Sequence, residues 1–168
     1  MRTPRERVLH LIPILESEHK LLEEFLDRAQ RIQEALLSAD PARLLPILDE
    51  QAQCLERLRN ADSDRAATVA GLAKLLELPG DTVTLDQLLP HVDSELRPRL
   101  EEISGACREA ARRVSRIQRI NAILAEKSLH CVEGLGRSLV AAIVEGPDYG
   151  PAGRRPASAP PAVLDRRA

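Results

Sequence analysis

Hydrophobic positions repeat every seven residues over the first part of the chain. Counting in sevens from Val8 gives one apolar row, and counting from Leu11 gives a second, which Glu18 interrupts once. Two interleaved rows of this kind are typical of an amphipathic helix that packs along a seam. The pattern predicts a helix over residues 5–38, in which Pro13 removes one backbone donor and marks a candidate kink. The two rows are Val8, Leu15, Leu22, Ala29 and Leu36, and Leu11, Glu18, Phe25 and Ile32.

A second helix is predicted to begin at Asp40-Pro41, because Asp caps exposed backbone N–H groups and Pro suits the first helical position. Helical spacing of apolar residues continues to the Leu78-Pro79-Gly80-Asp81 segment, which should end this helix. The Asn60-Ala61-Asp62-Ser63 segment predicts a break inside it. One broad apolar face is expected before that break, made of Leu44, Leu45, Ile47, Leu48, Cys54, Leu55 and Leu58.

Thr84-Leu85-Asp86-Gln87 has the pattern of a capping box and predicts a short helix that ends near Pro90 or His91. A third long helix should begin near Ser94 or Pro98 and reach Glu145, about 70 Å at the standard helical rise. Its seam carries Asn121, which resembles the buried Asn that fixes the register of coiled coils. The seam reads Leu100, Ile103, Cys107, Ala110, Val114, Ile117, Asn121, Leu124, Ser128, Cys131 and Leu135.

Composition supports the helical interpretation, since aromatic residues are 1% of the chain while hydrophobic residues reach 43%. Strands favour aromatic and β-branched residues, whereas Leu and Ala suit helices. The predicted fold class is all-α: an elongated antiparallel helical hairpin or bundle of three long helices plus one short helix. Residues 1–145 should form this helical domain. Residues 146–168 are rich in Pro, Gly and Arg and should be a flexible, disordered tail.

Charge patterning argues against nucleic acid and membrane as partners. The 24 basic and 26 acidic residues are interleaved and give a net charge of −2. One stretch of the third long helix is rich in arginine, but nearby glutamates favour a salt-bridged surface there rather than a phosphate-binding site. No apolar run approaches the roughly 20 residues of a membrane span, and residues 8–15 are too short for a secretory signal, so a soluble, cytoplasmic protein is expected. The basic stretch is Arg108, Arg112, Arg113, Arg116 and Arg119.

Catalytic chemistry finds little support in the sequence. Glu16 and His19 have the Glu-x-x-His spacing of a di-iron bundle, but that site needs the motif twice and two further glutamates, so no metal is predicted. The three cysteines have no CxxC spacing, and their helical positions favour packing over nucleophilic chemistry. Gly134-Leu135-Gly136 lies within a predicted helix and lacks the surroundings of a phosphate-binding loop. We therefore predict no catalytic residue, no cofactor and no enzymatic activity.

A protein-binding surface is predicted at the end of the third long helix. Residues 129–144 are largely apolar, yet Gly134 and Gly136 each cost a helix about 1 kcal/mol relative to alanine. An apolar segment that is locally weak suits docking of another chain, which would supply the missing packing. The predicted surface comprises Leu129, Val132, Leu135, Leu139, Val140, Ile143 and Val144.

Several segments together resemble the FlgN family of flagellar export chaperones. They are residues 32–40, residues 54–58, residues 84–89, the Ile120-Asn121 pair and residues 148–154. The resemblance covers roughly residues 8–154, and its most specific part is the Tyr149-Gly150-Pro151-Ala152-Gly153 segment after a long helix.

The resemblance implies a cytoplasmic chaperone that binds hook-associated proteins, prevents their premature assembly and delivers them to the flagellar type III export gate. It also implies that the end of the third long helix holds a client helix, while Tyr149, Gly150 and Gly153 help docking at the gate. The alternative is a coiled-coil adaptor that forms a homodimer through the same apolar surface and has no export role.

Overall fold

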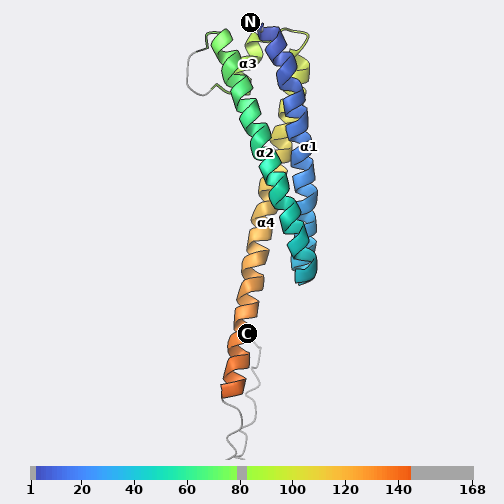
Figure 1. Cartoon of the computed structure of the whole chain (residues 1–168), viewed down its shortest axis with the longest axis vertical. Coiled ribbons are helices and arrows are strands. Elements are labelled where there is room, and N and C mark those ends of the chain that lie inside the picture. Colours follow the sequence, from blue (N-terminus) through green and yellow to red (C-terminus); the bar gives the residue numbers. More distant parts are fainter. Residues whose placement is uncertain (1–2, 79–82, 145–168) are drawn as a thin grey trace, which may run out of the picture. The chain divides into compact units, whose positions relative to one another are not determined.

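The computed structural model describes residues 3–78 and 83–144, with side chains as far as Val140 (Figure 1). These residues form the helices α1 (Pro4–Leu37), α2 (Pro41–Leu75), α3 (Leu85–Leu88) and α4 (Arg97–Val144), and a 3₁₀ turn, η1 (Leu89–His91). No strand occurs among them, which confirms the all-α prediction. The chain divides into two units, Met1–Ser128 and Leu129–Ala168. The predicted tail lies outside the described residues.

Helix α1 begins with a capping box that the sequence pattern did not single out. The Thr3 hydroxyl accepts a hydrogen bond from the Glu6 amide at 3.3 Å, and the Glu6 carboxylate accepts one from the Thr3 amide at 3.0 Å. Both bonds satisfy donors that a helix start leaves unpaired. Pro13 lies inside α1 without ending it, so the predicted helix over residues 5–38 is confirmed within one residue at each end.

The α1–α2 connection follows the predicted stop and start. One carboxylate oxygen of Asp40 accepts from the amides of Ala42 and Arg43, both at 3.1 Å. Ala39 takes a φ of 50°, the left-handed conformation that lets the chain turn out of α1. The predicted break at residues 60–63 is wrong, because α2 is continuous from Pro41 to Leu75. That segment contains neither Pro nor Gly, so nothing in it blocks a helical backbone.

The apolar face of α2 is narrower than predicted. Ile47 and Cys54 are buried, and the Cys54 thiol donates to the Leu21 carbonyl of α1 at 3.6 Å. Gln51 is also buried on this row. Its burial was not predicted, because a polar residue does not appear in an apolar pattern. A neighbouring row points away from α1 and is exposed, so it does not belong to the core: Leu45, Leu48 and Leu55.

Helix α3 begins with the predicted capping box, in which the Thr84 amide donates to the Gln87 side chain at 2.8 Å. The predicted seam of α4 is confirmed in the first unit, where its members from Leu100 to Asn121 are buried or half-buried. The Cys107 thiol donates to the Leu15 carbonyl at 3.3 Å and fixes the seam against α1.

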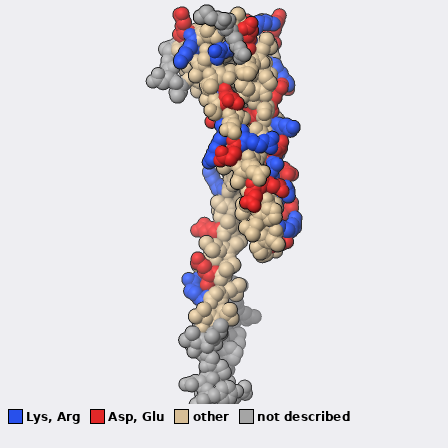
Figure 2. All heavy atoms as spheres, in the orientation of Figure 1, with Lys and Arg blue, Asp and Glu red and all other residues tan. Residues whose placement is uncertain are grey.

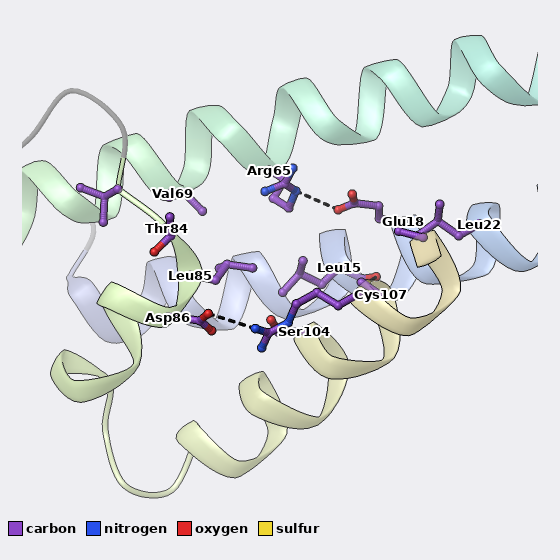
Figure 3. Close-up of a pocket in the computed structure, with 13 residues that line it drawn as sticks. Leu15, Glu18, Leu22, Arg65, Val69, Thr84, Leu85, Asp86, Ser104 and Cys107 are labelled. Carbon is purple, nitrogen blue, oxygen red and sulfur yellow. Dashed lines mark hydrogen bonds and ion pairs between the residues drawn. The ribbon is translucent and has the colours of Figure 1, made fainter. Parts of the chain in front are cut away.

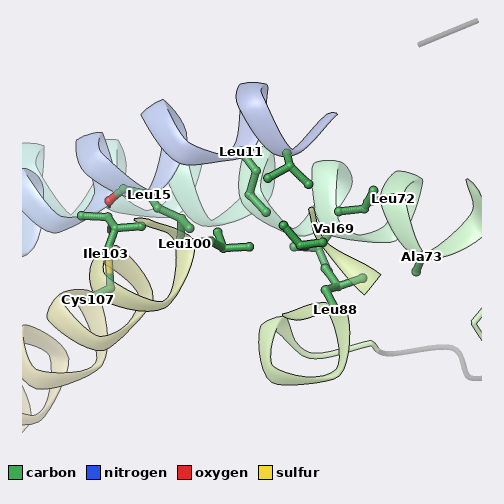
Figure 4. Packing of buried hydrophobic residues seen from close by; sticks show 11 residues of the cluster. Leu11, Leu15, Val69, Leu72, Ala73, Leu88, Leu100, Ile103 and Cys107 are labelled. Carbon is green, nitrogen blue, oxygen red and sulfur yellow. Dashed lines mark hydrogen bonds between the residues drawn. The ribbon is translucent and has the colours of Figure 1, made fainter. Parts of the chain in front are cut away.

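The largest hydrophobic core joins α1, α2, α4 and the short elements of the first unit (Figure 4). Leu88 of α3 and Leu100 of α4 are completely buried in it. Buried side chains from four helices, together with Val92 just after η1, therefore meet in one cluster. Its buried members are Val8, Leu11, Leu15, Val69, Leu72, Ala73, Leu88, Val92, Leu100, Ile103 and Cys107.

Acidic and basic side chains alternate over the surface of the first unit (Figure 2). Arg99 of α4 contacts Glu16 of α1 at 2.6 Å, and Arg31 of α1 contacts Glu50 of α2 at 2.9 Å. Both pairs are substantially exposed, and exposed pairs contribute little to stability. Arg31–Glu50 joins the antiparallel helices α1 and α2, whereas Arg99–Glu16 joins α1 to α4, which run parallel, as the Leu15–Cys107 and Ala29–Asn121 contacts also show (Figure 1).

Candidate functional site

A row of large apolar side chains is exposed on α4 in the second unit. Leu129, Val132, Leu139 and Val140 are 60 to 66% exposed, and Leu135 is 71% exposed. These values contrast with the buried α4 seam of the first unit, where Leu100 has no exposure. Contiguous exposed apolar residues are typical of an interaction site.

The row has the spacing of a helix that receives a partner. Val132, Leu135 and Leu139 follow one another at intervals of three and four residues, which places them on one side of α4. Leu129 and Val140 widen this side. We call these five side chains the apolar face of α4. A partner helix with anchors at the same intervals would match it.

Two glycines lie in the same stretch of α4, and packing within the described chain does not require them. At 3.6 residues per turn, Gly136 falls within the sector of the apolar face, whereas Gly134 falls on the opposite side of the helix. A Cβ atom added at Gly134 or Gly136 would meet nothing within 4 Å. The Ser138 hydroxyl donates to the Gly134 carbonyl at 3.0 Å, so the helix remains regular there. Gly136 leaves room for close approach of another chain on the apolar face.

Some predicted site residues cannot be placed. Ile143 and Val144 belong to α4, but their side chains lie outside the described part of the structure. Tyr149, Gly150 and Gly153 lie outside the described residues. The structure therefore describes the side chains of five of the seven predicted client-binding residues and none of the predicted gate-docking residues.

The first unit contains a cavity of about 410 Å³ between α1, α2, α4 and the 83–86 segment (Figure 3). Glu18 and Arg65 form an ion pair at 3.0 Å on its wall, and Arg108 and Asp86 form another at 3.0 Å. Leu15, Val69 and Cys107 are among its apolar lining residues. The sequence did not predict this cavity. One signal was available, because Glu18 interrupts an otherwise apolar row, and a carboxylate in such a position needs a partner such as Arg65.

Burial changes the chemistry of two groups in the cavity wall. Burial raises the pKa of the Glu18 carboxyl, and the positive charge of Arg65 opposes that effect. Burial also raises the pKa of the Cys107 thiol to about 11, and the nearby Glu18 charge adds to the shift. Since the thiolate is the nucleophilic form, Cys107 is an inert packing residue at neutral pH.

The other predicted chemical candidates are dispersed. Cys54 is buried, and burial raises its pKa, while Cys131 is exposed. His19 contacts Glu23 at 3.9 Å. Within residues 3–78 and 83–144, no three His, Cys, Asp or Glu side chains lie close enough together to hold a metal ion.

The basic stretch of α4 is only partly the salt-bridged face predicted for it. Arg108 contacts Asp86 at 3.0 Å, Arg113 contacts Glu23 at 2.9 Å and Arg112 contacts Glu109 at 3.6 Å. Among the described residues, Arg116 and Arg119 form no ion pair.

These features define a class of protein: an all-α protein with a packed first unit and an exposed apolar helix face suited to binding another protein. In the described part of the chain, no helix is long and apolar enough to cross a membrane. The model of a known family, described as FlgN protein, matches residues 8–157.

The chain therefore belongs to the FlgN family, whose members are chaperones of flagellar assembly and export that bind hook-associated proteins. No curated protein and no solved structure gives a significant match. The family match agrees with the resemblance seen in the sequence.

Proposed function

We propose that this chain is a cytoplasmic chaperone of type III export that holds a helix of a hook-associated protein on the apolar face of α4. The exposure of that face carries the proposal. Five large apolar side chains, each 60% exposed or more, lie on one stretch of α4, whereas the seam of the same helix up to Asn121 is buried or half-buried. Membership of the FlgN family supports the same role.

Client binding would cover the apolar face with side chains at matching helical intervals. Full burial of a Val or Leu side chain is worth about 1.5 to 3 kcal/mol, so the exposed parts of these five would yield about 1 to 2 kcal/mol each before the cost of association. Ile143 and Val144 extend the proposed surface by one turn. A covered client segment is unable to pair with its assembly partners, which explains how premature assembly is prevented.

Delivery to the export gate is assigned to the segment after α4. Tyr149, Gly150 and Gly153 form the part of the chain that most specifically resembles the family. We expect Tyr149→Ala to retain client binding while weakening capture by the cytoplasmic domain of the export gate in a pull-down. Equal capture of the two proteins would overturn this assignment.

Co-production with the C-terminal segment of a hook-associated protein tests the client site. We expect a complex that remains intact in size-exclusion chromatography. A variant with Val132→Ser, Leu135→Ser and Leu139→Ser should lose the complex. The matched control replaces three exposed leucines of α2, Leu45, Leu48 and Leu55, by Ser and should retain it. No complex with the unaltered chain, or equal loss in both variants, would contradict the proposal.

A coiled-coil adaptor is the alternative function, because the same apolar face could pair with a second copy of the chain. Light scattering separates the two functions. If the chain is a chaperone, adding the client should dissociate any dimer that the chain forms. If it is an adaptor, the chain should stay a tight dimer whether or not a client is added.

A further inference from the structure

The outward side of α4 in the first unit carries a row of arginines with isoleucines beside it. Arg112, Arg116, Arg119 and Ile123 follow at intervals of four, three and four residues. At 3.6 residues per turn they fall within a sector of about 60°, over a length of about 16 Å. Ile120 and Ile123 are 40% and 47% exposed. We call these five residues the basic face of α4.

The basic face differs from the rest of the first unit in its ion pairing. Most arginines elsewhere on these helices reach an acidic group of another element: Arg99 reaches Glu16 and Arg57 reaches Glu24. On the basic face, Arg112 reaches only Glu109 of its own helix, at 3.6 Å, with both side chains more than 60% exposed. Arg116 and Arg119 have no acidic partner in the described part of the chain.

Neighbouring positive charges on one helical side destabilise the helix. Arg112 and Arg116 are four residues apart, and Arg116 and Arg119 are three apart, so each pair is close enough to repel. With Glu109 counted, the face carries a net charge of +2, in a chain whose total is −2. A negatively charged partner would remove this repulsion.

We propose that the basic face of α4 binds an acidic amphipathic helix of a partner protein. Carboxylates spaced by one turn would pair with the arginines, while apolar residues of the partner would cover Ile120 and Ile123. The two exposed isoleucines favour a protein helix over nucleic acid, because a phosphate backbone offers no apolar surface for them. This site is separate from the proposed client site, which uses residues 129–144.

The test uses the full chain and a fluorescein-labelled helical peptide of 14 residues, with Glu at intervals of four and three and Leu on the adjoining positions. Fluorescence anisotropy should show saturable binding that weakens as salt is added. A variant with Arg112→Glu, Arg116→Glu and Arg119→Glu should bind at least about tenfold more weakly. Ile120→Ser with Ile123→Ser should also weaken binding.

Controls separate this site from general electrostatic attraction. A variant with Lys20→Glu, Arg43→Glu and Lys74→Glu has the same net charge, alters exposed positions elsewhere and should bind normally. A peptide of scrambled sequence should bind more weakly. No saturable binding, an equal loss in both triple variants, or tighter binding of double-stranded DNA or of phosphatidylglycerol vesicles would overturn the proposal. The arginine variant should bind the client as the unaltered chain does. A failure of the basic-face proposal is therefore distinguishable from a failure of the client-site proposal.

Discussion

The side-chain amide of Asn121 donates a hydrogen bond to the backbone carbonyl of Ala29 at 2.7 Å and thereby ties α4 to α1. Both residues are buried, Ala29 completely. The amide oxygen of Asn121 is buried without a hydrogen-bond partner among the described atoms. This one side chain therefore combines a specific contact between two helices with an unsatisfied polar atom.

Asn121→Leu should raise the free energy of unfolding by about 1 kcal/mol. A buried unpaired polar group costs about 1 to 3 kcal/mol, whereas a typical hydrogen bond contributes about 0.5 to 1.5 kcal/mol. Urea unfolding measures the change, and Ile117→Ala, at a buried apolar position of the same seam, should lower stability by about 2 to 5 kcal/mol. A loss of more than about 1 kcal/mol in Asn121→Leu would show that the Ala29 contact outweighs the unpaired oxygen. If Asn121 sets the register, the stabilised variant should also show broadened amide resonances along α1 and α4.

The three cysteines should react at very different rates in the folded protein. Burial raises the pKa of Cys107 to about 11, so at pH 8 only about one thiol in a thousand is ionised there. Cys54 is also buried, with a raised pKa, whereas Cys131 is exposed. Labelling with a chromogenic disulfide should show one fast thiol, and Cys131→Ser should remove that phase. Two fast phases in the unaltered protein would contradict the packing of Cys54 or of Cys107 against α1.

Glu18 should make the protein less stable as pH rises. Burial raises its pKa above the ordinary 4.5, so the folded state binds a proton more readily than the unfolded state just above that pH. Stability from this group is therefore present at low pH and is lost as pH rises through the folded-state pKa. The free energy of unfolding is measured from pH 4 to 7 for the unaltered chain and for Glu18→Gln. The difference, unaltered minus variant, should fall as pH rises. A difference that rises with pH would mean that the Arg65 ion pair affects the pKa of Glu18 more than burial does.

Much of the first unit could be predicted from local signals. Asp40 and Thr84 have short-range roles as helix caps, which depend only on residues two or three positions away. The seam up to Asn121 followed from a seven-residue repeat. These features are encoded within a few turns of helix, so one sequence suffices to find them.

The features that were missed depend on packing between distant segments. The predicted break in α2 rested on turn-forming residues at 60–63, but Arg65 pairs with Glu18 of α1, and the buried Val69 holds the following turns in the core. The burial of Gln51 likewise depends on where α1 lies. Tertiary contacts of this kind override local preference and leave no periodic signal. The proposed client surface rests on an apolar segment of the sequence, but the identity of its partner has no trace in this chain alone.

Gly134→Ala with Gly136→Ala should stabilise α4 and weaken client binding. Each substitution favours a helix by about 0.4 to 1 kcal/mol when the conformation is compatible, and in the described structure neither new Cβ meets an atom within 4 Å. Circular dichroism should therefore show higher helical content or a higher midpoint of unfolding. A client helix on the apolar face would instead meet the methyl group added at Gly136, so its dissociation constant should rise several-fold, while the substitution at Gly134, on the opposite side of α4, acts on helix stability.

Gly105→Ala is the matched control for this pair. Gly105 also lies in α4, is exposed, and has nothing within 4 Å of an added Cβ. It should raise helix stability by a similar amount per residue and leave client affinity unchanged. If the Gly134 and Gly136 substitutions stabilise the helix and strengthen client binding, the glycines serve only to loosen α4. In that case the client does not approach the helix at this point, and its contacts must lie on the leucines and valines alone.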